Sequence, residues 1–330
     1  MVPEPTLVER FRRDLDALID RGARIGVAVS GGPDSMALLL LCAAARPGKI
    51  EAATVDHALR PESRGEAEMV SAVCRQLQVP HAILTVEWDE IPSSAIQERA
   101  RDVRYRLLGA WMKRQGLAAL LTAHHADDQA ETLLMRMNRG SGTRGLAGMR
   151  PAAIIPGANL PLIRPLLGWR RTELKAICTH AGVKTVVDPS NSDGQFERVQ
   201  VRQALAGANW LDASALARSA ANLASADEAL DWMASSLALV RVTDDAEGLR
   251  VDPEGLPSEI KRRLLLIAFA RFEAPEPRGP ELSRAIDALE LGRTITLSGL
   301  KLEGGPVWRA TKAPARSRVR NGAVTDSTHG

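Results

Sequence analysis

The stretch IGVAVSGGPDSMALLL, residues 25–40, joins a short apolar run to a helical run through two adjacent glycines. Its first part is typical of a buried strand, and the pattern predicts a helix that begins near Pro33. Gly31 and Gly32 allow backbone N–H groups to converge on an anion, and the positive end of the helix dipole would lie behind them. The stretch therefore predicts a phosphate-binding turn, with a tight turn capped by Asp34 as the simpler alternative.

The residues beside the glycines distinguish this turn from two familiar phosphate loops. It lacks the Lys-Ser or Lys-Thr pair of a P-loop NTPase, and its glycines do not have the G-x-G-x-x-G spacing of a Rossmann site. Ser30 and Ser35 would add hydroxyl donors. Asp34 would be repelled by a phosphate unless a cation lies between them, and we expect Mg²⁺ to fill that role.

The change from apolar run to helical run recurs along the first half of the chain. Such alternation predicts a parallel sheet covered by helices, the α/β class. The expected strands are 24–30 and the runs EAATVDHA (51–58), HAILTVEW (81–88) and LAALLTAHH (117–125), and the expected helices are 62–77, 94–115 and 127–138.

A polar motif follows each expected strand or lies in the helix after it. Ligands of open parallel sheets bind beyond the carboxyl ends of the strands, where the strand order reverses. The shared location therefore indicates one composite site. The motifs are SGGPDS (30–35), DHALRPES (56–63), ERARDVRY (98–105) and HHADDQAET (124–132).

The second and third motifs carry basic groups. His57 and Arg60 would lie where they can meet a nucleotide or its phosphates, and a buried structural His57 is an equal alternative. Arg101, Arg104 and Tyr105 share one helix face, which could bind a carboxylate or an RNA phosphate. Pairing with acidic neighbours on the same helix is the alternative.

The fourth motif crowds titratable groups at the start of a helix: His124, His125, Asp127, Asp128 and Glu131. We predict no zinc site here, because the H-E-x-x-H spacing is absent and no cysteine is near. Either Asp127 or Asp128 is expected to cap the helix. The other carboxylate, with Glu131, would be free to recognise an ammonium group or accept its proton.

The rest of the chain predicts a lid, a helical segment and a small module. Residues 139–167 are rich in Gly, Pro and Arg and predict a loop or lid, made anion-seeking by Arg139 and Arg144. Helices are expected over 168–182 and 211–240. We place an N-terminal catalytic domain at 1–209, an α+β module with its helical linker at 210–315, and a disordered basic tail at 316–330.

Composition bounds the class of protein. The 330 residues are 45% hydrophobic and 25% charged, with no apolar stretch that would cross a bilayer and no secretory signal at the start. We therefore expect a cytoplasmic protein that does not contact membranes. Cys42, Cys74 and Cys178 are too scattered for a disulfide framework or a zinc or redox motif and are expected to be buried. The net charge of +3, with locally concentrated arginines, suits a large anionic partner, with ordinary solvated faces as the alternative, which we favour for the basic tail.

The hexapeptide SGGPDS resembles the SGGxDS signature of the PP-loop ATP pyrophosphatases, which activate an acceptor by adenylation and release pyrophosphate. With the later motifs, the chain resembles one family of that superfamily, the tRNA(Ile)-lysidine synthases. The resemblance covers about residues 24–209 and, more weakly, PRGPELSRAIDALELG (277–292). Its motifs are SGGPDS, TVDHALRPES (54–63), ERARDVRY (98–105), AHHADDQAETLLMRMNRGSGTRGLAGM (123–149), RPLL (164–167) and DPSNSDGQFERVQVR (188–202).

The resemblance implies a fold of the adenine nucleotide alpha hydrolase type and a ligase that uses ATP and Mg²⁺. ATP would adenylate the C2 carbonyl oxygen of the wobble cytidine in the CAU anticodon of tRNA(Ile). The ε-amino group of free L-lysine would then attack C2 and expel AMP. The product, lysidine, would change the tRNA from methionine to isoleucine identity and its codon from AUG to AUA.

The resemblance also implies roles for particular residues, with one departure. Val199 stands where the family usually has Asn, which weakens the assignment of the neighbouring Arg198. The resemblance implies catalytic roles for Asp34, His125 and Asp128. The residues expected to contact ATP are Ser30, Gly31, Gly32, Pro33, Asp34, Ser35, His57 and Arg60. Those expected to contact lysine or tRNA are Arg104, Asp127, Glu131, Arg139, Arg144, Arg164, Arg198 and Arg202.

Two other functions fit parts of the pattern. A PP-loop tRNA thiolase would need sulfur-carrying cysteines or an iron–sulfur cluster, which three scattered cysteines disfavour. A non-catalytic RNA-binding or nucleotide-sensing protein could keep the same fold. The sequence leaves the oligomeric state open, with a homodimer among the options.

Overall fold

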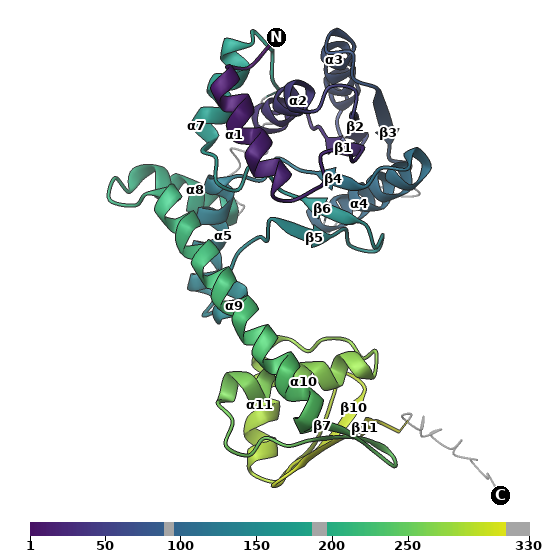
Figure 1. Ribbon diagram of the computed structural model, residues 1–330, viewed down its shortest axis with the longest axis vertical. Coiled ribbons are helices and arrows are strands. Elements are labelled where there is room, and N and C mark those ends of the chain that lie inside the picture. Colours follow the sequence, from purple (N-terminus) through teal and green to yellow (C-terminus); the bar gives the residue numbers. More distant parts are fainter. Residues whose placement is uncertain (89–95, 187–196, 315–330) are drawn as a thin grey trace, which may run out of the picture. The chain divides into compact units, whose positions relative to one another are not determined.

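The computed structural model describes residues 1–88, 96–186 and 197–314 (Figure 1). The chain divides into two compact units, Met1–Ser225 and Ala226–Gly330. The division falls inside helix α9 (Ala213–Arg241), sixteen residues beyond the boundary that we placed from the sequence at Asn209. The predicted basic tail and the whole DPSNSDGQF segment (188–196) lie outside the described residues.

The first unit is built on a six-stranded sheet with the order β3-β2-β1-β4-β6-β5. Every neighbouring pair is parallel except β5 with β6. The parallel core confirms the predicted α/β class. The strands are β1 (Ile25–Ala28), β2 (Ile50–Asp56), β3 (His81–Thr85), β4 (Ala119–Leu121), β5 (Ala152–Ile154) and β6 (Pro161–Ile163).

Helices cover both faces of this sheet because its strands alternate between two apolar cores. Val27 and Leu121 belong to a core shared with the first three helices and α7, whereas Ala53 and Leu120 pack with α4. Side chains of adjacent strand residues point to opposite faces, so a fully buried strand reads as a continuous apolar run. The helices are α1 (Pro5–Asp16), α2 (Pro33–Ala45), α3 (Ser63–Gln76), α4 (Ile96–Gln115), α5 (Ala126–Asn138), α6 (Thr143–Leu146), α7 (Arg171–His180) and α8 (Glu197–Gly207).

The strand order reverses between β1 and β4. The chain runs outward from β1 to β2 and β3, and β4 then pairs with the other side of β1. Ligands of such sheets bind at this reversal, beyond the carboxyl ends of the strands. The two segments that begin there are the glycine turn after β1 and the HHADD segment after β4.

The stretch predicted as a loop or lid, 139–167, is partly regular structure. It contains α6 and the strands β5 and β6, which extend the sheet beyond β4. The prediction of an unstructured loop was wrong there because three-residue strands are too short to show a period-two pattern.

The second unit contains a five-stranded antiparallel sheet, in the order β7-β8-β11-β10-β9, packed against helices. This arrangement confirms the predicted α+β module, although the hairpin of β7 and β8 was not expected. In the described part of the chain no helix is long and apolar enough to span a membrane. The elements are β7 (Val242–Asp245), β8 (Gly248–Val251), α10 (Ser258–Arg271), α11 (Gly279–Glu290), β9 (Thr294–Leu297), β10 (Leu300–Glu303) and β11 (Trp308–Lys312).

Candidate active site

The glycine turn after β1 has the geometry of a phosphate cradle. Gly31 has φ +86°, a left-handed conformation that favours glycine, and its carbonyl accepts a hydrogen bond from the Val186 N–H at 2.9 Å. The Ser35 hydroxyl accepts from the Ser30 N–H at 3.1 Å and donates to the Gly32 carbonyl at 3.0 Å. Gly32 is the N-cap of α2, so the free N–H groups of the first helical turn face the turn.

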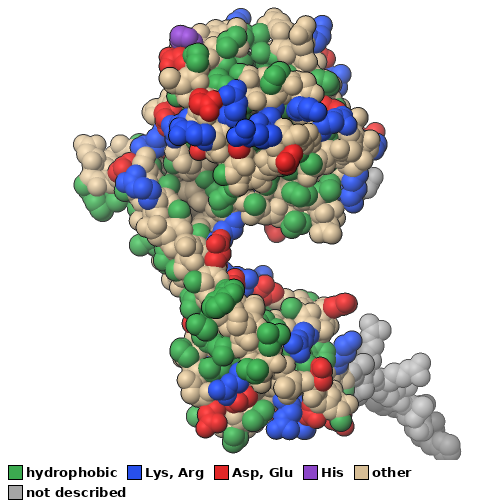
Figure 2. Space-filling model, viewed as in Figure 1, with side chains coloured by type: hydrophobic (Ala, Val, Ile, Leu, Met, Phe, Trp, Pro, Cys, Tyr) green, Lys and Arg blue, Asp and Glu red, His purple; other side chains and the backbone are tan. Residues whose placement is uncertain are grey.

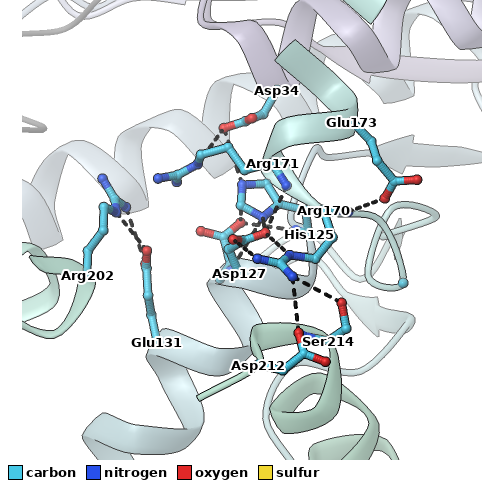
Figure 3. A network of polar contacts seen from close by, with 12 residues as sticks. Asp34, His125, Asp127, Glu131, Arg170, Arg171, Glu173, Arg202, Asp212 and Ser214 are labelled. Atoms are coloured by element: carbon cyan, nitrogen blue, oxygen red, sulfur yellow. Dashed lines mark hydrogen bonds and ion pairs between the residues drawn. The ribbon is translucent and has the colours of Figure 1, made fainter. Parts of the chain in front are cut away.

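Asp34, in the first turn of α2, meets His125 across the strand reversal. Its Oδ2 lies 3.3 Å from His125 Nε2, which joins the glycine turn to the HHADD segment (Figure 3). Asp34 Oδ1 is buried and has no hydrogen-bond partner among the described residues. A buried oxygen left unpaired by the protein is available to a ligand.

His125, rather than an aspartate, caps helix α5. The Asp128 N–H donates to His125 Nδ1 at 3.4 Å, and the His125 N–H donates to Asp128 Oδ2 at 3.0 Å. The prediction that Asp127 or Asp128 is the N-cap was therefore wrong; Asp128 is the reciprocal partner in the capping box. Histidine is not among the favoured N-cap residues, which explains why propensity missed it.

His125 and Asp128 have shifted pKa values. Burial would lower the pKa of His125, but Asp34 and Asp128 hold it above the ordinary value. Burial would raise the pKa of Asp128, but His125, Arg198 and His124 hold it below its usual range. Asp128 therefore stays anionic close to the phosphate turn.

Asp127 is fastened to the start of α7. Its Oδ2 accepts from the Arg171 N–H at 2.8 Å and from Arg170 Nε at 3.3 Å. Arg170 also donates to Asp212 and Ser214, and Arg171 Nε lies 3.9 Å from Asp34 Oδ2 (Figure 3). Sequence reasoning missed both arginines. The available signal was a pair of cations at a predicted helix N-terminus, where the helix dipole disfavours positive charge.

Glu131 is buried against α8. The carboxylate, 1% exposed, accepts from Arg202 Nε at 2.7 Å and Nη2 at 3.2 Å, and Arg198 Nε lies 3.0 Å away. The two arginines are four residues apart and so share the face of α8 that packs on α5. Val199, at the position of the departure noted above, is buried in the same helix.

A second cluster of basic groups surrounds Tyr105. The guanidinium groups of Arg101 and Arg104 each lie 5.1 Å from the ring centroid, as the shared helix face predicted. Arg164 is buried and donates to the Arg150 carbonyl at 2.7 Å, while its Nε has no hydrogen-bond partner among the described residues. Burial and Arg104 lower the pKa of His57, against the opposing charge of Asp56.

Three further predicted residues, Arg60, Arg139 and Arg144, also belong to the first unit. Arg60 pairs with Glu66 at 3.2 Å, Arg139 pairs with Glu197, and Arg144 is exposed in α6. On the face shown in Figure 2, basic side chains gather across this unit.

The three cysteines are buried and free, as predicted. No group of three or more metal-ligating side chains occurs within the ranges that the structure describes.

Known proteins carry the same architecture and sequence pattern. The family model described as a PP-loop domain matches residues 7–208. The tRNA(Ile)-lysidine synthase of Novosphingobium aromaticivorans is 47% identical over 92% of this chain and 93% of its own, and that of Zymomonas mobilis is 43% identical over 90% of each. The chain belongs to the tRNA(Ile)-lysidine synthase family.

The family's fold also appears in more distant structures. A U34-tRNA thiolase from Methanococcus maripaludis, solved with its 4Fe-4S cluster, matches with a TM-score of 0.54 and 16% identity, covering 66% of this chain and 78% of that one. At this identity the likeness shows the PP-loop fold alone. Membership in the lysidine synthase family therefore rests on the sequence relatives.

His124 gives a prediction for stability against pH. Burial, opposed by Asp128 and aided by Arg164, lowers its pKa to about 4. Between that value and the unfolded pKa of about 6.5, the unfolded chain binds more protons at His124 than the folded chain does. The free energy of unfolding therefore decreases as the pH falls through this range. We expect the stability advantage of wild type over His124→Gln to shrink by on the order of 3 kcal/mol between pH 6.5 and 4. Urea unfolding of both proteins across this range checks it, and a constant difference contradicts it.

Proposed function

We propose that this chain ligates free L-lysine to C2 of the wobble cytidine in the CAU anticodon of tRNA(Ile), through an adenylated cytidine. The observation that carries the proposal is the contact of Asp34 with His125, which joins the phosphate turn to the acidic helix start at one sheet edge. The family's sequence relatives bear the corresponding name. The cytidine must leave its stack to enter this site, as for other enzymes that act on a base.

The glycine turn is proposed to hold the ATP phosphates during adenylation. The cytidine C2 carbonyl oxygen attacks the α-phosphorus, and the bond to the departing pyrophosphate breaks. Mg²⁺ fits the unpaired Oδ1 of Asp34, since carboxylate oxygens are preferred ligands and the ion usually keeps phosphate and water ligands as well. When bound, it would neutralise phosphate charge beside this carboxylate.

Asp128 is the proposed carboxylate for the lysine amine. Asp127 and Glu131 are held by arginines, whereas the hydrogen bonds and ion pair of Asp128 in the described part of the chain go to His125, with Arg198 and His124 acting on it only electrostatically. The lowered pKa of Asp128 keeps it anionic and suited to an ammonium group. Attack on C2 needs a neutral amine, so the ammonium group, with a free pKa of about 10.4, must pass a proton to a nearby base.

The tRNA is proposed to bind mainly through its phosphates. Such binding weakens steeply with salt, by about 10³-fold or more between 50 and 200 mM for ~6 neutralised phosphates. The proposed contacts, which include both exposed and ion-paired side chains, are Arg104, Arg139, Arg144, Arg164, Arg198 and Arg202.

The direct test is one reaction with tRNA transcript, ATP and labelled lysine. We expect multiple-turnover release of AMP and pyrophosphate to depend on lysine and to occur only with unmodified CAU-anticodon tRNA(Ile). Turnover without lysine or without tRNA would overturn the proposal.

A thiolase is disfavoured because burial raises the pKa of Cys74 and of Cys178 to about 12. Activity that survives replacement of all three cysteines by serine would exclude the thiolase alternative.

The two glycines of the turn give a matched pair of variants. A Cβ at Gly32 would meet nothing closer than Ser30 Oγ at 3.7 Å, and its φ of −70° suits alanine. Gly31→Ala is strained because Gly31 has φ +86°. We expect Gly32→Ala to keep the wild-type melting temperature while ATP affinity falls about tenfold, and Gly31→Ala to lose about 1–3 kcal/mol of stability. Calorimetry measures both; unchanged ATP affinity in Gly32→Ala would show that phosphate does not approach this backbone.

A further inference from the structure

The phosphate turn lacks a lysine, and the structure places another cation against it. ATP and pyrophosphate carry several negative charges, which the backbone donors of a turn only partly offset. Arg171 begins helix α7, far from the turn in sequence, yet its Nε lies 3.9 Å from Asp34 Oδ2. We propose that Arg171 binds the β- and γ-phosphates of ATP and stabilises the departing pyrophosphate.

The guanidinium of Arg171 lies close to Asp34 but does not form a hydrogen bond with it. At 3.9 Å its approach to Asp34 is too long for a hydrogen bond, and the side chain keeps 23% of its surface. The adjacent Arg170 is engaged by Asp127, Asp212 and Ser214. In Figure 3 the Arg171 guanidinium reaches past Asp34 towards Arg202. Of these two adjacent arginines, Arg171 is therefore the one whose guanidinium N–H groups are available to a ligand.

The start of α7 is held rigidly enough to position this charge. Arg171 donates its backbone N–H to Asp127, so the residue is fixed through its main chain whatever its side chain does. Glu173 accepts from the Arg170 N–H at 2.7 Å and from Arg10 at 2.6 Å, which ties α7 to the N-terminal helix. A charge held in place before the reaction needs no reorganisation when negative charge develops.

This inference rests on the proposed function. It names the group that offsets the negative charge of the departing pyrophosphate in the adenylation step. As the C2 carbonyl oxygen bonds to the α-phosphorus, the phosphorus–oxygen bond to the β-phosphate breaks and its electron pair leaves with pyrophosphate. The guanidinium donates hydrogen bonds to those oxygens and no proton is transferred. A bidentate guanidinium matches phosphate geometry, which an ammonium group does not.

The test measures binding of pyrophosphate, ATP and AMP to the full chain in the presence of Mg²⁺. Arg171→Gln removes the charge and keeps the backbone N–H, and Lys175→Gln, exposed on the same helix, is the control. We expect Arg171→Gln to weaken pyrophosphate and ATP binding by about 10- to 100-fold and leave AMP binding unchanged. Arg171→Lys should recover part of the loss, and the control should bind all three like wild type.

The outcomes separate this inference from the proposed function. Wild-type pyrophosphate affinity in Arg171→Gln, or an equal loss for AMP, would overturn the role of Arg171. Lysine incorporation by wild type is measured independently, so its failure would overturn the proposed function alone. If Arg171→Gln does not fold, the test uses Arg171→Lys. Wild-type pyrophosphate affinity and wild-type pyrophosphate release in Arg171→Lys would contradict a bidentate contact.

Discussion

Replacing Asp34 by alanine is expected to lower the rate of AMP release at least about 10²-fold, with tRNA affinity nearly unchanged. The reason is local: Asp34 supplies the buried, unpaired Oδ1 at the phosphate turn and one of the two carboxylates that raise the pKa of His125. Among the described residues its ion pairs are with His125 and Arg171, neither of which is proposed to bind tRNA. Single-turnover kinetics and tRNA binding measured on the same preparation check both parts.

The control for Asp34 is a carboxylate of the same unit with no place in the site. Glu68 is 61% exposed on α3 and pairs with Arg64, so Glu68→Ala should react like wild type. Asp34→Asn keeps the shape and loses the charge, which separates a steric effect from loss of a metal ligand. If Asp34→Ala keeps the wild-type rate, the role assigned to Asp34 at the phosphate turn is wrong.

The sequence predicted those parts of the site that lie within short motifs. The glycine turn, His125 and Asp128 could be located because each follows an apolar run whose end defines a strand terminus, and parallel strands end at the same sheet edge. Their meeting across β1 and β4 depends only on the strand order. A local pattern therefore carried enough information to bring two distant motifs together.

The contacts that hold the site required the structure. Arg170 and Arg171 bind Asp127, more than forty residues away, and no spacing rule links two such segments. Glu131 and Arg202 were each predicted to meet a substrate, but in the structure they contact each other. Opposite charges on separate helices have no sequence signature until the packing of α5 on α8 is known.

The pairing of Glu131 predicts a large loss of stability. Replacing both Arg198 and Arg202 by methionine leaves a carboxylate that is 1% exposed without its cations, which should cost about 3–5 kcal/mol of unfolding free energy. Adding Glu131→Leu to that double variant should recover most of the loss, because apolar groups replace the whole buried ion pair. Chemical denaturation of the three proteins measures the effect.

The ion pair of Arg139 with Glu197 is an exposed control for the buried ion pairs of Glu131, because it also links the α5 and α8 regions. Arg139 follows α5 and pairs with Glu197 at the start of α8, with 60% and 39% of the two side chains exposed. Arg139→Met should therefore change stability by about 0–1 kcal/mol. Equal losses for the buried and exposed pairs would contradict a structural role for Glu131. If the double variant is as stable as wild type but binds tRNA weakly, Arg198 and Arg202 serve the RNA, and the position of α8 depends instead on its buried apolar residue Val199.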